Sequence, residues 1–554
     1  MGTILFDNEI TVIEAGNISH SAQSLVVTFS SFGDNDPSLP GFGQAFLEKN
    51  GCFVIAVKKR ADNWYRDLSL QDFADVVMPF CGRAKHCFTY GASMGGYAAL
   101  YFASIIHAQP IAISPRNSID PRFFLPEYAR FRNSWPNHDL ALSAVSNPGI
   151  RPYVVFDPRV KADLTYIDKE VRPAFPDGLY TEFAFSGHPS ARAMSEAGHL
   201  KSFVAGALQG HAMPGRLVSR AVKRRSATIL NEMSKWNLTR KRLDRALRLS
   251  QAALQIGGEQ SDFLYHKGAL MIASGNLDGA LKLTETMIGT RGGSASLFHR
   301  MASLLVRLGR LEEAVAAADA GLELSPQSIG LLRTRRNALE KMERFEQAYA
   351  DGLFILNSGF GSASDHLHVS GHLISMRNYA GALDHLDSSI DENASLLALR
   401  RRRDCLDALS RHYDAVEAAG RVVSLAPRNV ADILHLAHLN KRVRNIPGAI
   451  AALDDGIALL PKSLELHRVK RDYLMAANRL TEAVDAAIAV VKIAAHSSND
   501  VAVLRWLRVR QMHQQVTVAG RDNLIRWQDY AIRIPRFFMS SEPIAILDTL
   551  VSTF

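Results

Sequence analysis

Cysteine is scarce in this chain of 554 residues: Cys52, Cys81, Cys87 and Cys405 are the whole set, and none of them forms a CxxC pair. So few cysteines exclude a disulfide framework, and their spacing does not match a structural zinc site. The dinucleotide pattern G-x-G-x-x-G and the phosphate-loop pattern GKS/T are also missing. We therefore expect no metal and no cofactor.

Long apolar stretches are missing as well. No window reaches the roughly 18 consecutive apolar residues of a membrane-spanning helix, and the nearest approach, residues 97–113, is interrupted by His107, Gln109 and Pro110. The N-terminus, MGTILFDNEI, lacks the basic start and apolar stretch of a signal peptide. Phe6 stands where a myristoylation signal needs Ser or Thr. These features predict a soluble, cytoplasmic chain without a membrane span.

The length exceeds what one hydrophobic core supports, so we expect more than one domain. The formal net charge is +9, which suits either an acidic partner, such as an anionic glycan, or simply a solvated basic surface. The most basic runs, residues 220–225 (RAVKRR) and 400–403 (RRRR), are not interleaved with the aromatic residues that stack on bases. This pattern argues against nucleic acid as the partner.

The first 210 residues alternate short β-rich runs with stretches of helix length. The runs expected to form strands are 25–29, 52–57, 86–90, 110–113, 153–156 and 182–185, and the clearest expected helices are 70–80 and 95–106. Most of the strand runs are continuously apolar, which is typical of parallel strands buried on both faces. The alternation predicts a doubly wound α/β sheet with helices on both sides.

After residue 226 the strand pattern ends and a repeat of the form apolar-x-x-Ala begins. It occurs at Leu243/Ala246, Leu277/Ala280, Leu311/Ala314, Phe345/Ala348, Tyr379/Ala382, Tyr413/Val416, Ile446/Ala449 and Leu480/Ala483. The second positions are separated by 34, 34, 34, 34, 34, 33 and 34 residues. A fixed period of this length predicts one helical hairpin per repeat.

Residues 227–497 therefore resemble the tetratricopeptide repeat (TPR) family, in about eight units forming an all-α superhelical solenoid. The small residue expected early in each first helix appears as Gly268, Ala302 and Ala437, whereas Arg336 and Asp404 fill that slot elsewhere. The expected organisation is an α/β domain at 1–212, a basic linker helix at 213–226, the repeats, and a helical cap at 498–554.

The segment 86–100 reads HCFTYGASMGGYAAL, in which a strand runs into Gly91-Ala92-Ser93-Met94-Gly95 and a small-residue helix follows. This is the G-x-S-x-G turn in the strand–helix context that it requires. The glycines let the strand and helix approach closely, while the turn raises the serine hydroxyl to the carboxyl edge of the sheet. We therefore identify Ser93 as a candidate nucleophile.

Residues 1–210 accordingly resemble the α/β-hydrolases. TFSSFG, NWY, GASMGGYAAL, ISPRNSID and the FDP…D pattern are similar to a bacterial subgroup whose relatives occur among polysaccharide biosynthesis proteins. In α/β-hydrolases the acid and the histidine follow the serine, each in a loop after a later strand. His188 directly follows the last predicted strand run, TEFAFSG, and is the expected base.

Three aspartates compete for the role of the acid. Asp157 ends the strand run YVVF, Asp163 follows in the same loop, and Asp168 lies within the next expected helix. Asp163 is also well suited to be an N-cap. The resemblance favours Asp163, with Asp157 as the alternative, because compact members of the superfamily carry one Asp at the strand end and the triad acid about five residues later.

The expected oxyanion hole takes one backbone N–H from Met94 and the other from Ser31 or Phe32, in the loop after the strand 25–29. Two further loops should open on the same edge. Trp64 and Tyr65 form either a stacking wall for substrate or part of the core, and Arg116 either holds an anionic group or lies on the surface.

These features predict a serine esterase or acyl-transfer enzyme acting on a small ester or an acylated glycan, with a solenoid that binds a protein partner. One alternative is an interaction scaffold whose hydrolase domain is weak or inactive. Another is a basic solenoid, centred on residues 400–403, that docks an anionic glycan.

Overall fold

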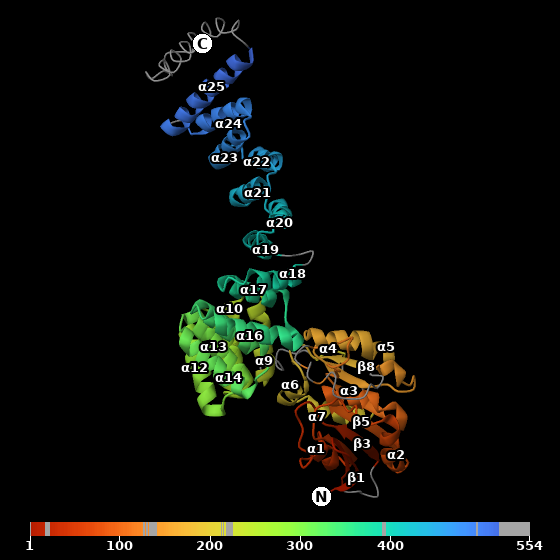
Figure 1. Ribbon diagram of the computed structural model, residues 1–554. Helices are drawn as coiled ribbons and strands as arrows, with labels where there is room; N and C mark the ends of the chain where they lie inside the picture. The colour runs from red at the N-terminus through yellow and green to blue at the C-terminus, as the bar shows by residue number, and fades with distance from the viewer. Residues whose placement is uncertain are drawn as a thin grey trace. The chain divides into compact units, whose positions relative to one another are not determined.

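The computed structural model describes residues 2–16, 23–125, 128, 131, 141–211, 213, 215–217, 225–390, 395–494 and 497–519 (Figure 1). The chain divides into two compact units, Met1–Gly292 and Gly293–Phe554. The first unit therefore contains the sheet together with the first helices of the repeat region. Much of the expected linker helix, including residues 218–224, lies outside the described residues.

A sheet of eight strands forms the centre of the first unit among the described residues. The strands are β1 (Thr3–Asp7), β2 (Thr11–Ala15), β3 (Ser24–Phe29), β4 (Phe53–Lys59), β5 (His86–Ala92), β6 (Gln109–Ile113), β7 (Tyr153–Phe156) and β8 (Leu179–Glu182). Their order is β1-β2-β4-β3-β5-β6-β7-β8. Strand β3 is parallel to its neighbours β4 and β5, and β6, β7 and β8 continue in the same direction. The carboxyl ends of these six strands therefore meet at one edge.

Two features of the sheet differ from the sequence prediction. Strands β1 and β2 were not expected, and they add antiparallel strands to one side, so the sheet is mixed. Strand β8 ends at Glu182, where the prediction began it, because this edge strand is only half-buried and lacks a continuous apolar run. The apolar residues that suggested a later strand, Phe183 and Phe185, are buried in the following loop.

Helices cover both faces of the sheet, as the doubly wound prediction requires. They are α1 (Gln44–Lys49), α2 (Leu70–Cys81), α3 (Met94–Tyr101), α4 (Lys161–Tyr166), α5 (Arg172–Ala174), α6 (Ala191–Glu196) and α7 (Leu200–Leu208), with short turns η1 (Ser104–Ile106), η3 (Leu142–Ala144) and η4 (Ile167–Val171). Residues of α2, α3 and α4 pack into the core on one face. Residues of α1, α6 and α7 pack on the other, together with Ile229 from the repeat region.

The repeat region consists of helical hairpins from α9 to α24, followed by α25. The helices are α9 (Ala227–Thr239), α10 (Leu243–Gly257), α11 (Ser261–Ala273), α12 (Leu277–Arg291), α13 (Ala295–Leu308), α14 (Leu311–Leu324), α15 (Ile329–Lys341), α16 (Phe345–Ile355), α17 (Ala363–Ser375), α18 (Tyr379–Ser389), α19 (Leu396–Ala408), α20 (His412–Leu425), α21 (Val430–Arg442), α22 (Ile446–Leu459), α23 (Leu464–Ala476), α24 (Leu480–Ile493) and α25 (Ser498–Ala519), with a turn η5 (Leu356–Phe360) after α16. The second helix of most hairpins begins at the apolar residue that the repeat pattern marks.

One repeat is shifted from the sequence alignment. Helix α20 begins at His412, and the fully buried small residue is Ala415, whereas Tyr413 is 77% exposed. The one step of 33 residues therefore leads from Ala382 to Ala415, and the step from Ala415 to Ala449 has the usual 34 residues. The same shift places Arg403, not Asp404, in the slot of the first helix that normally holds a small residue.

With this correction, the slot alternates between small residues and arginine along the second unit. Ala302, Ser370 and Ala437 alternate with Arg336, Arg403 and Arg471. Each of these arginines is buried and donates to an aspartate in the helix that follows its own hairpin: Arg336 to Asp365 (2.9 Å), Arg403 to Asp432 (2.9 Å) and Arg471 to Asp500 (3.1 Å). The substitutions that made these repeats look irregular are thus a second, longer period of two hairpins.

Helix α25 packs against α24 through the buried Leu507. The remainder of the expected cap, including Ile546, Leu547 and Leu550, lies outside the described residues. Across the helices that the structure describes, none is both long and apolar enough to cross a membrane.

Candidate active site at the carboxyl edge of the sheet

Ser93 occupies a strained turn between β5 and α3. Its backbone has φ 55° and ψ −118°, a conformation that side chains other than glycine rarely adopt. A Cβ atom at Gly91 would lie 2.2 Å from the carbonyl oxygen of Gly95, and one at Gly95 would lie 2.4 Å from that of Phe29. Neither position can therefore carry a side chain, which is the steric reason that the sequence pattern gives for both glycines.

Ser93, His188 and Asp163 lie in one hydrogen-bonded series. The distance from Ser93 Oγ to His188 Nε2 is 2.7 Å, and the distance from His188 Nδ1 to Asp163 Oδ2 is 2.8 Å. The Asp163 side chain is fully buried, whereas Ser93 and His188 are partly exposed. In this geometry the hydroxyl faces solvent, the imidazole can accept its proton, and a buried carboxylate fixes the imidazole from behind.

The two competing aspartates occupy different positions. Asp157 accepts hydrogen bonds from the backbone N–H groups of Arg159 and Gly187, both at 2.9 Å, and so holds the turn that carries His188 rather than its ring. Burial raises the pKa of Asp157, an effect that these backbone hydrogen bonds oppose. Asp168 lies at the surface, paired with Arg172 at 3.0 Å. The N-cap of α4 is Val160, so Asp163 does not cap that helix.

Arg116 lies at the acid rather than at an open anion site. Its guanidinium Nη1 is 3.2 Å from Asp163 Oδ1, the oxygen that His188 does not use, and its Nε donates to Ser118 Oγ at 3.1 Å. The residue is only 9% exposed. Its backbone N–H also donates to the Ser93 carbonyl at 3.2 Å. The sequence placed Arg116 at the correct edge but gave no indication of this partner.

The loop after β3 carries Ser31 and Phe32, the two candidates for the second amide donor. The backbone N–H of Ser31 donates to Asp34 at 3.0 Å, and that of Gly33 donates to Asp62 at 2.9 Å. Ser31 also donates its hydroxyl to the carbonyl of Ala92 at 3.0 Å, which fixes the loop beside Ser93. Within the described residues, the Phe32 N–H has no such acceptor, so Phe32 rather than Ser31 is the available donor beside Met94.

A buried lysine supports this loop. Lys59, at the end of β4, is fully buried and donates to Asp62 (2.7 Å), to Asn35 (2.6 Å) and to the carbonyl of Asp34 (3.1 Å). Burial lowers the pKa of Lys59, although the hydrogen bond and charge of Asp62 oppose this effect. Sequence reasoning missed this residue, because nothing in the VKKR run indicates that its lysines are buried.

Trp64 and Tyr65 are both buried. Tyr65 packs edge-on against Phe29, with ring centroids 5.4 Å apart, and donates its hydroxyl to the carbonyl of Ser30 at 2.8 Å. Tyr65 is therefore part of the core and does not form a stacking wall for substrate. Trp64 packs against the ring of Phe32 at 5.8 Å. Through this contact Trp64 supports Phe32, one of the two candidate oxyanion donors.

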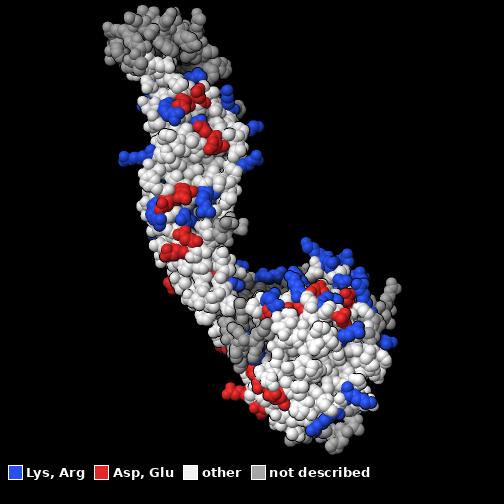
Figure 2. Space-filling model, turned by 90° about the vertical axis from the view of Figure 1, so that its right-hand side faces the viewer, with Lys and Arg blue, Asp and Glu red and all other residues white. Residues whose placement is uncertain are grey.

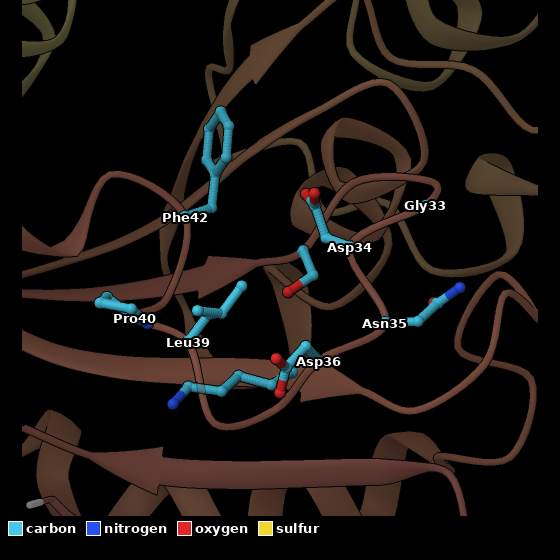
Figure 3. A pocket seen from close by; sticks show the side chains of 9 residues that line it. Gly33, Asp34, Asn35, Asp36, Leu39, Pro40 and Phe42 are labelled. Carbon is cyan, nitrogen blue, oxygen red and sulfur yellow. The ribbon is translucent and has the colours of Figure 1, made fainter. Parts of the chain in front are cut away.

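A polar cavity of about 500 Å³ lies against the same loop, on a part that Ser93 does not line (Figure 3). Ser30 and Gly33 belong to its wall, and Lys58 contributes from β4. The remaining lining combines carboxylate and amide groups with an apolar side: Asp34, Asn35, Asp36, Leu39, Pro40 and Phe42. Such a lining can bind a polar group. In the described part of the chain, no cluster of three metal-ligating side chains is present.

In the basic run 400–403, three of the four arginines pair with aspartates. Arg400 and Arg403 both pair with Asp432, Arg402 donates to Asp387 at 2.7 Å, and Arg401 donates to the carbonyl of Leu367 at 2.7 Å. On the face that Figure 2 shows, basic and acidic side chains are intermixed along the helices of the second unit. The hypothesis of an anionic glycan docked on these arginines stays a prediction.

Comparisons with known proteins found similar solved structures but no matching family. No protein-family model matches the chain, and no curated protein matches it. The chain is similar to the TPR protein YrrB (19% identity, 34% of this chain and 97% of that one, TM-score 0.31). It is also similar to a TPR protein from Cytophaga hutchinsonii (11%, 43% and 98%, 0.38) and to pilF of Pseudomonas aeruginosa (15%, 39% and 97%, 0.33). The chain itself combines a mixed α/β sheet domain with a run of paired helices.

Proposed function

We propose that the sheet domain is a serine hydrolase of the α/β type, in which Ser93 is the nucleophile, His188 the general base and Asp163 the acid. The observation that carries this proposal is the continuous hydrogen-bonded series from Ser93 through His188 to Asp163, located at the carboxyl edge of a largely parallel sheet. The strained backbone of Ser93 adds support, because strain of this kind is concentrated at functional sites.

In the proposed reaction, His188 Nε2 accepts the proton of Ser93 as Oγ attacks the carbonyl carbon of an ester. The carbonyl oxygen becomes an anion, which the N–H groups of Met94 and Phe32 stabilise. The tetrahedral intermediate then collapses, the bond to the alcohol breaks, and the departing oxygen takes the proton from His188. Water or an acceptor alcohol, deprotonated by the same imidazole, releases the acyl group from Ser93 by the reverse sequence.

Asp163 stays ionised throughout and orients the imidazole so that Nε2 faces Ser93. Arg116 holds the second oxygen of Asp163, which leaves one oxygen for His188. The proposed substrates are carboxylic esters or thioesters. The sequence resemblance suggests an acylated glycan within that class, and hydrolysis and acyl transfer use the same residues.

For the paired helices we propose a protein-interaction role. Stacked helical hairpins form an extended surface suited to peptides and protein partners. YrrB, one of the similar solved structures, is described as a TPR protein with an unusual peptide-binding site. In this proposal the repeats recruit a protein partner to the hydrolase.

The proposal is tested by labelling the full chain with a fluorophosphonate probe. Wild-type protein should react at Ser93, Ser93→Ala should not react at all, and His188→Ala should react more slowly by about 1,000-fold or more. Ser202→Ala, at an exposed serine of α7, is the matched control and should react like wild type. Labelling that persists in Ser93→Ala contradicts the assignment of the nucleophile.

An interaction scaffold with an inactive hydrolase domain is the second candidate, and the repeats favour it. It predicts that folded wild-type protein does not react with the probe. A series of nitrophenyl esters of increasing acyl length then measures the acyl pocket of a reactive enzyme, and no turnover with any of them would favour the scaffold.

A further inference from the structure

The first helix of the repeats, α9, is part of the unit that holds the candidate active site. Helices α9 to α12 belong to the same compact unit as the sheet, and α9 lies beside α6 (Figure 1). Ile229 of α9 is fully buried in the core on one face of the sheet, where it packs with residues of α6 and α7. The repeat region and the sheet domain thus share a hydrophobic core.

Trp236 of α9 contacts the loop that carries His188. Its ring lies edge-on to Phe185, with centroids 5.8 Å apart, three residues before His188. The guanidinium of Arg159 lies over both rings, 4.3 Å from the centroid of Phe185 and 5.0 Å from that of Trp236. Arg159 belongs to the loop between β7 and α4, which leads to Asp163. One side chain of α9 therefore meets both loops that supply partners to Ser93.

Asp157 connects these contacts to the imidazole. Its two carboxylate oxygens accept from the backbone N–H groups of Arg159 and Gly187, so the two loops are tied together directly before His188. On the other side of His188, the Ser190 N–H donates to Ser114 Oγ at 3.1 Å. The backbone around His188 is thus held at both ends.

Two more contacts fix α9 against the same region. The side chain of Glu232 lies against Gly187, where an added Cβ atom would come within 3.3 Å of Glu232 Cγ. At the N-terminus of α9, Glu196 of α6 accepts from the hydroxyl of Ser226 at 2.6 Å and from the backbone N–H of Thr228 at 2.9 Å. These hydrogen bonds lower the pKa of Glu196 against the opposing effect of burial.

We propose that α9 is a positioning element of the hydrolase site, in which Trp236, packed on Phe185 and Arg159, holds the His188 turn within proton-transfer distance of Ser93. The inference rests on the proposed function. It makes the first repeat helix an integral part of the catalytic unit, and Trp236 a positioning residue that acts through Phe185 and Gly187 without touching the substrate.

The test compares full-length Trp236→Ala with Trp236→Phe, and with Leu270→Ala as a control. Leu270 is buried in α11 of the same unit and reports the effect of a cavity there. Trp236→Ala should lower the rate of fluorophosphonate labelling at Ser93 by about tenfold or more, since a misplacement of about 1 Å in a catalytic group costs up to ~100-fold. Trp236→Phe should restore most of the rate, because an aromatic ring still packs on Phe185.

The pH profile of labelling separates positioning from general destabilisation. In wild type the labelling rate should depend on pH, because an imidazole acts as the general base. In Trp236→Ala this dependence should weaken, because the imidazole is no longer held against Ser93. Leu270→Ala should keep the wild-type profile. Arg159→Ala, at an exposed side chain, should lower the rate in the same direction by a smaller factor, and it covers the case in which Trp236→Ala does not fold.

Hydrogen exchange provides a measurement that does not depend on activity. Peptides covering residues 185–190 should exchange faster in Trp236→Ala than in Leu270→Ala. If both variants label and exchange alike, the positioning role of α9 is wrong. If wild-type protein is not labelled at all, the proposed hydrolase function fails instead, and the exchange data still decide whether Trp236 holds the His188 turn.

Discussion

The sheet domain and the second unit both bury charged side chains, but they arrange them differently. In the sheet domain the buried charges gather at the carboxyl edge: Lys59 with Asp62 under the loop after β3, Arg116 with Asp163, and Asp157 under the His188 turn. In the second unit they recur at every second hairpin, as Arg336–Asp365, Arg403–Asp432 and Arg471–Asp500.

The difference shows what each part of the molecule uses its buried charges for. Parallel strands deliver loops from distant parts of the sequence to one edge, so charges placed there can converge on a single serine. In a solenoid each hairpin contacts its neighbours, so the same chemistry can only join one hairpin to the next. Convergence is typical of a site, and periodicity is typical of a scaffold.

The largest expected effect comes from removing the charge of Lys59, one of the buried charges at the carboxyl edge of the sheet. Lys59→Met leaves Asp62 buried without its partner, and removing one member of a buried pair costs about 3–5 kcal/mol. The variant should lose that much unfolding free energy in urea and should label slowly at Ser93, because the loop that presents the Phe32 amide is released. Lys49→Met, at an exposed lysine of α1, is the control. A loss of stability no larger than that of Lys49→Met would contradict the supporting role of Lys59.

Removing one of the buried arginines that recur along the second unit should cost less unfolding free energy. Arg403→Met removes one of the two arginines on Asp432, and the loss of a buried charged hydrogen bond costs about 2 kcal/mol. Labelling of Ser93 should not change. Lys462→Met, at an exposed lysine, should be neutral in the same urea titration. An undiminished unfolding free energy in Arg403→Met would show that the alternation of arginine has no structural importance.

Arg116 is the buried charge at the carboxyl edge that contacts the proposed catalytic acid, Asp163. Arg116→Gln keeps a hydrogen-bond donor near Asp163 but removes the charge, and the labelling rate should fall by about tenfold as Asp163 and His188 lose their fixed alignment. Arg151→Gln, at an exposed arginine before β7, is the control. A substrate-binding role for Arg116 predicts instead that KM rises while kcat is preserved, which ester hydrolysis kinetics can distinguish.

The smallest expected effect is a dependence of the second unit's stability on acid pH. The hydrogen bond from Arg468, opposed by burial and assisted by Ser497 and Arg471, lowers the pKa of Asp500 from 3.8 to about 2. Folding therefore favours the ionised carboxylate, so this contribution is complete above about pH 4 and is lost as the pH falls toward 2.

The measurement for Asp500 is urea unfolding across that pH range. The difference in unfolding free energy between wild type and Asp500→Asn should shrink as the pH falls from about 4 through 2, the value of its lowered pKa, and should level off only below that pH. Asp485→Asn, at an exposed aspartate of α24, should differ little from wild type at any pH. A constant difference across the range would mean that the carboxylate charge of Asp500 does not contribute.

Much of the fold could be predicted because its signals are local. Continuous apolar runs marked β3 to β7, and a fixed period marked the hairpins. Strands β1 and β2 were missed because they are short and contain charged residues. The alignment error at Tyr413 arose because a deletion of one residue can be placed on either side of a hairpin when only one position is compared.

For the candidate site, the turn pattern and the chain order predicted Ser93 and His188, and the family resemblance favoured Asp163 over Asp157 as the acid. The geometry brings Ser93, His188 and Asp163 together. The neighbours of that set were not predictable. The ion pair of Arg116 with Asp163 joins residues 47 positions apart, and the contact of Trp236 with Phe185 joins two regions that seemed to be separate domains. Such contacts depend on the packing of whole elements and leave no pattern in the sequence.

The alternation of arginine and small residues limits how this solenoid can change in length. The third residue of the helix after each slot alternates as well, from Asp365 to Ala398 to Asp432 to Leu466. Removing the single hairpin α17–α18 would set Arg336 against Ala398, a guanidinium in the core with no acceptor. Removing two neighbouring hairpins would again give Arg336 an aspartate, Asp432. Insertions and deletions in this part of the chain should therefore be tolerated in pairs.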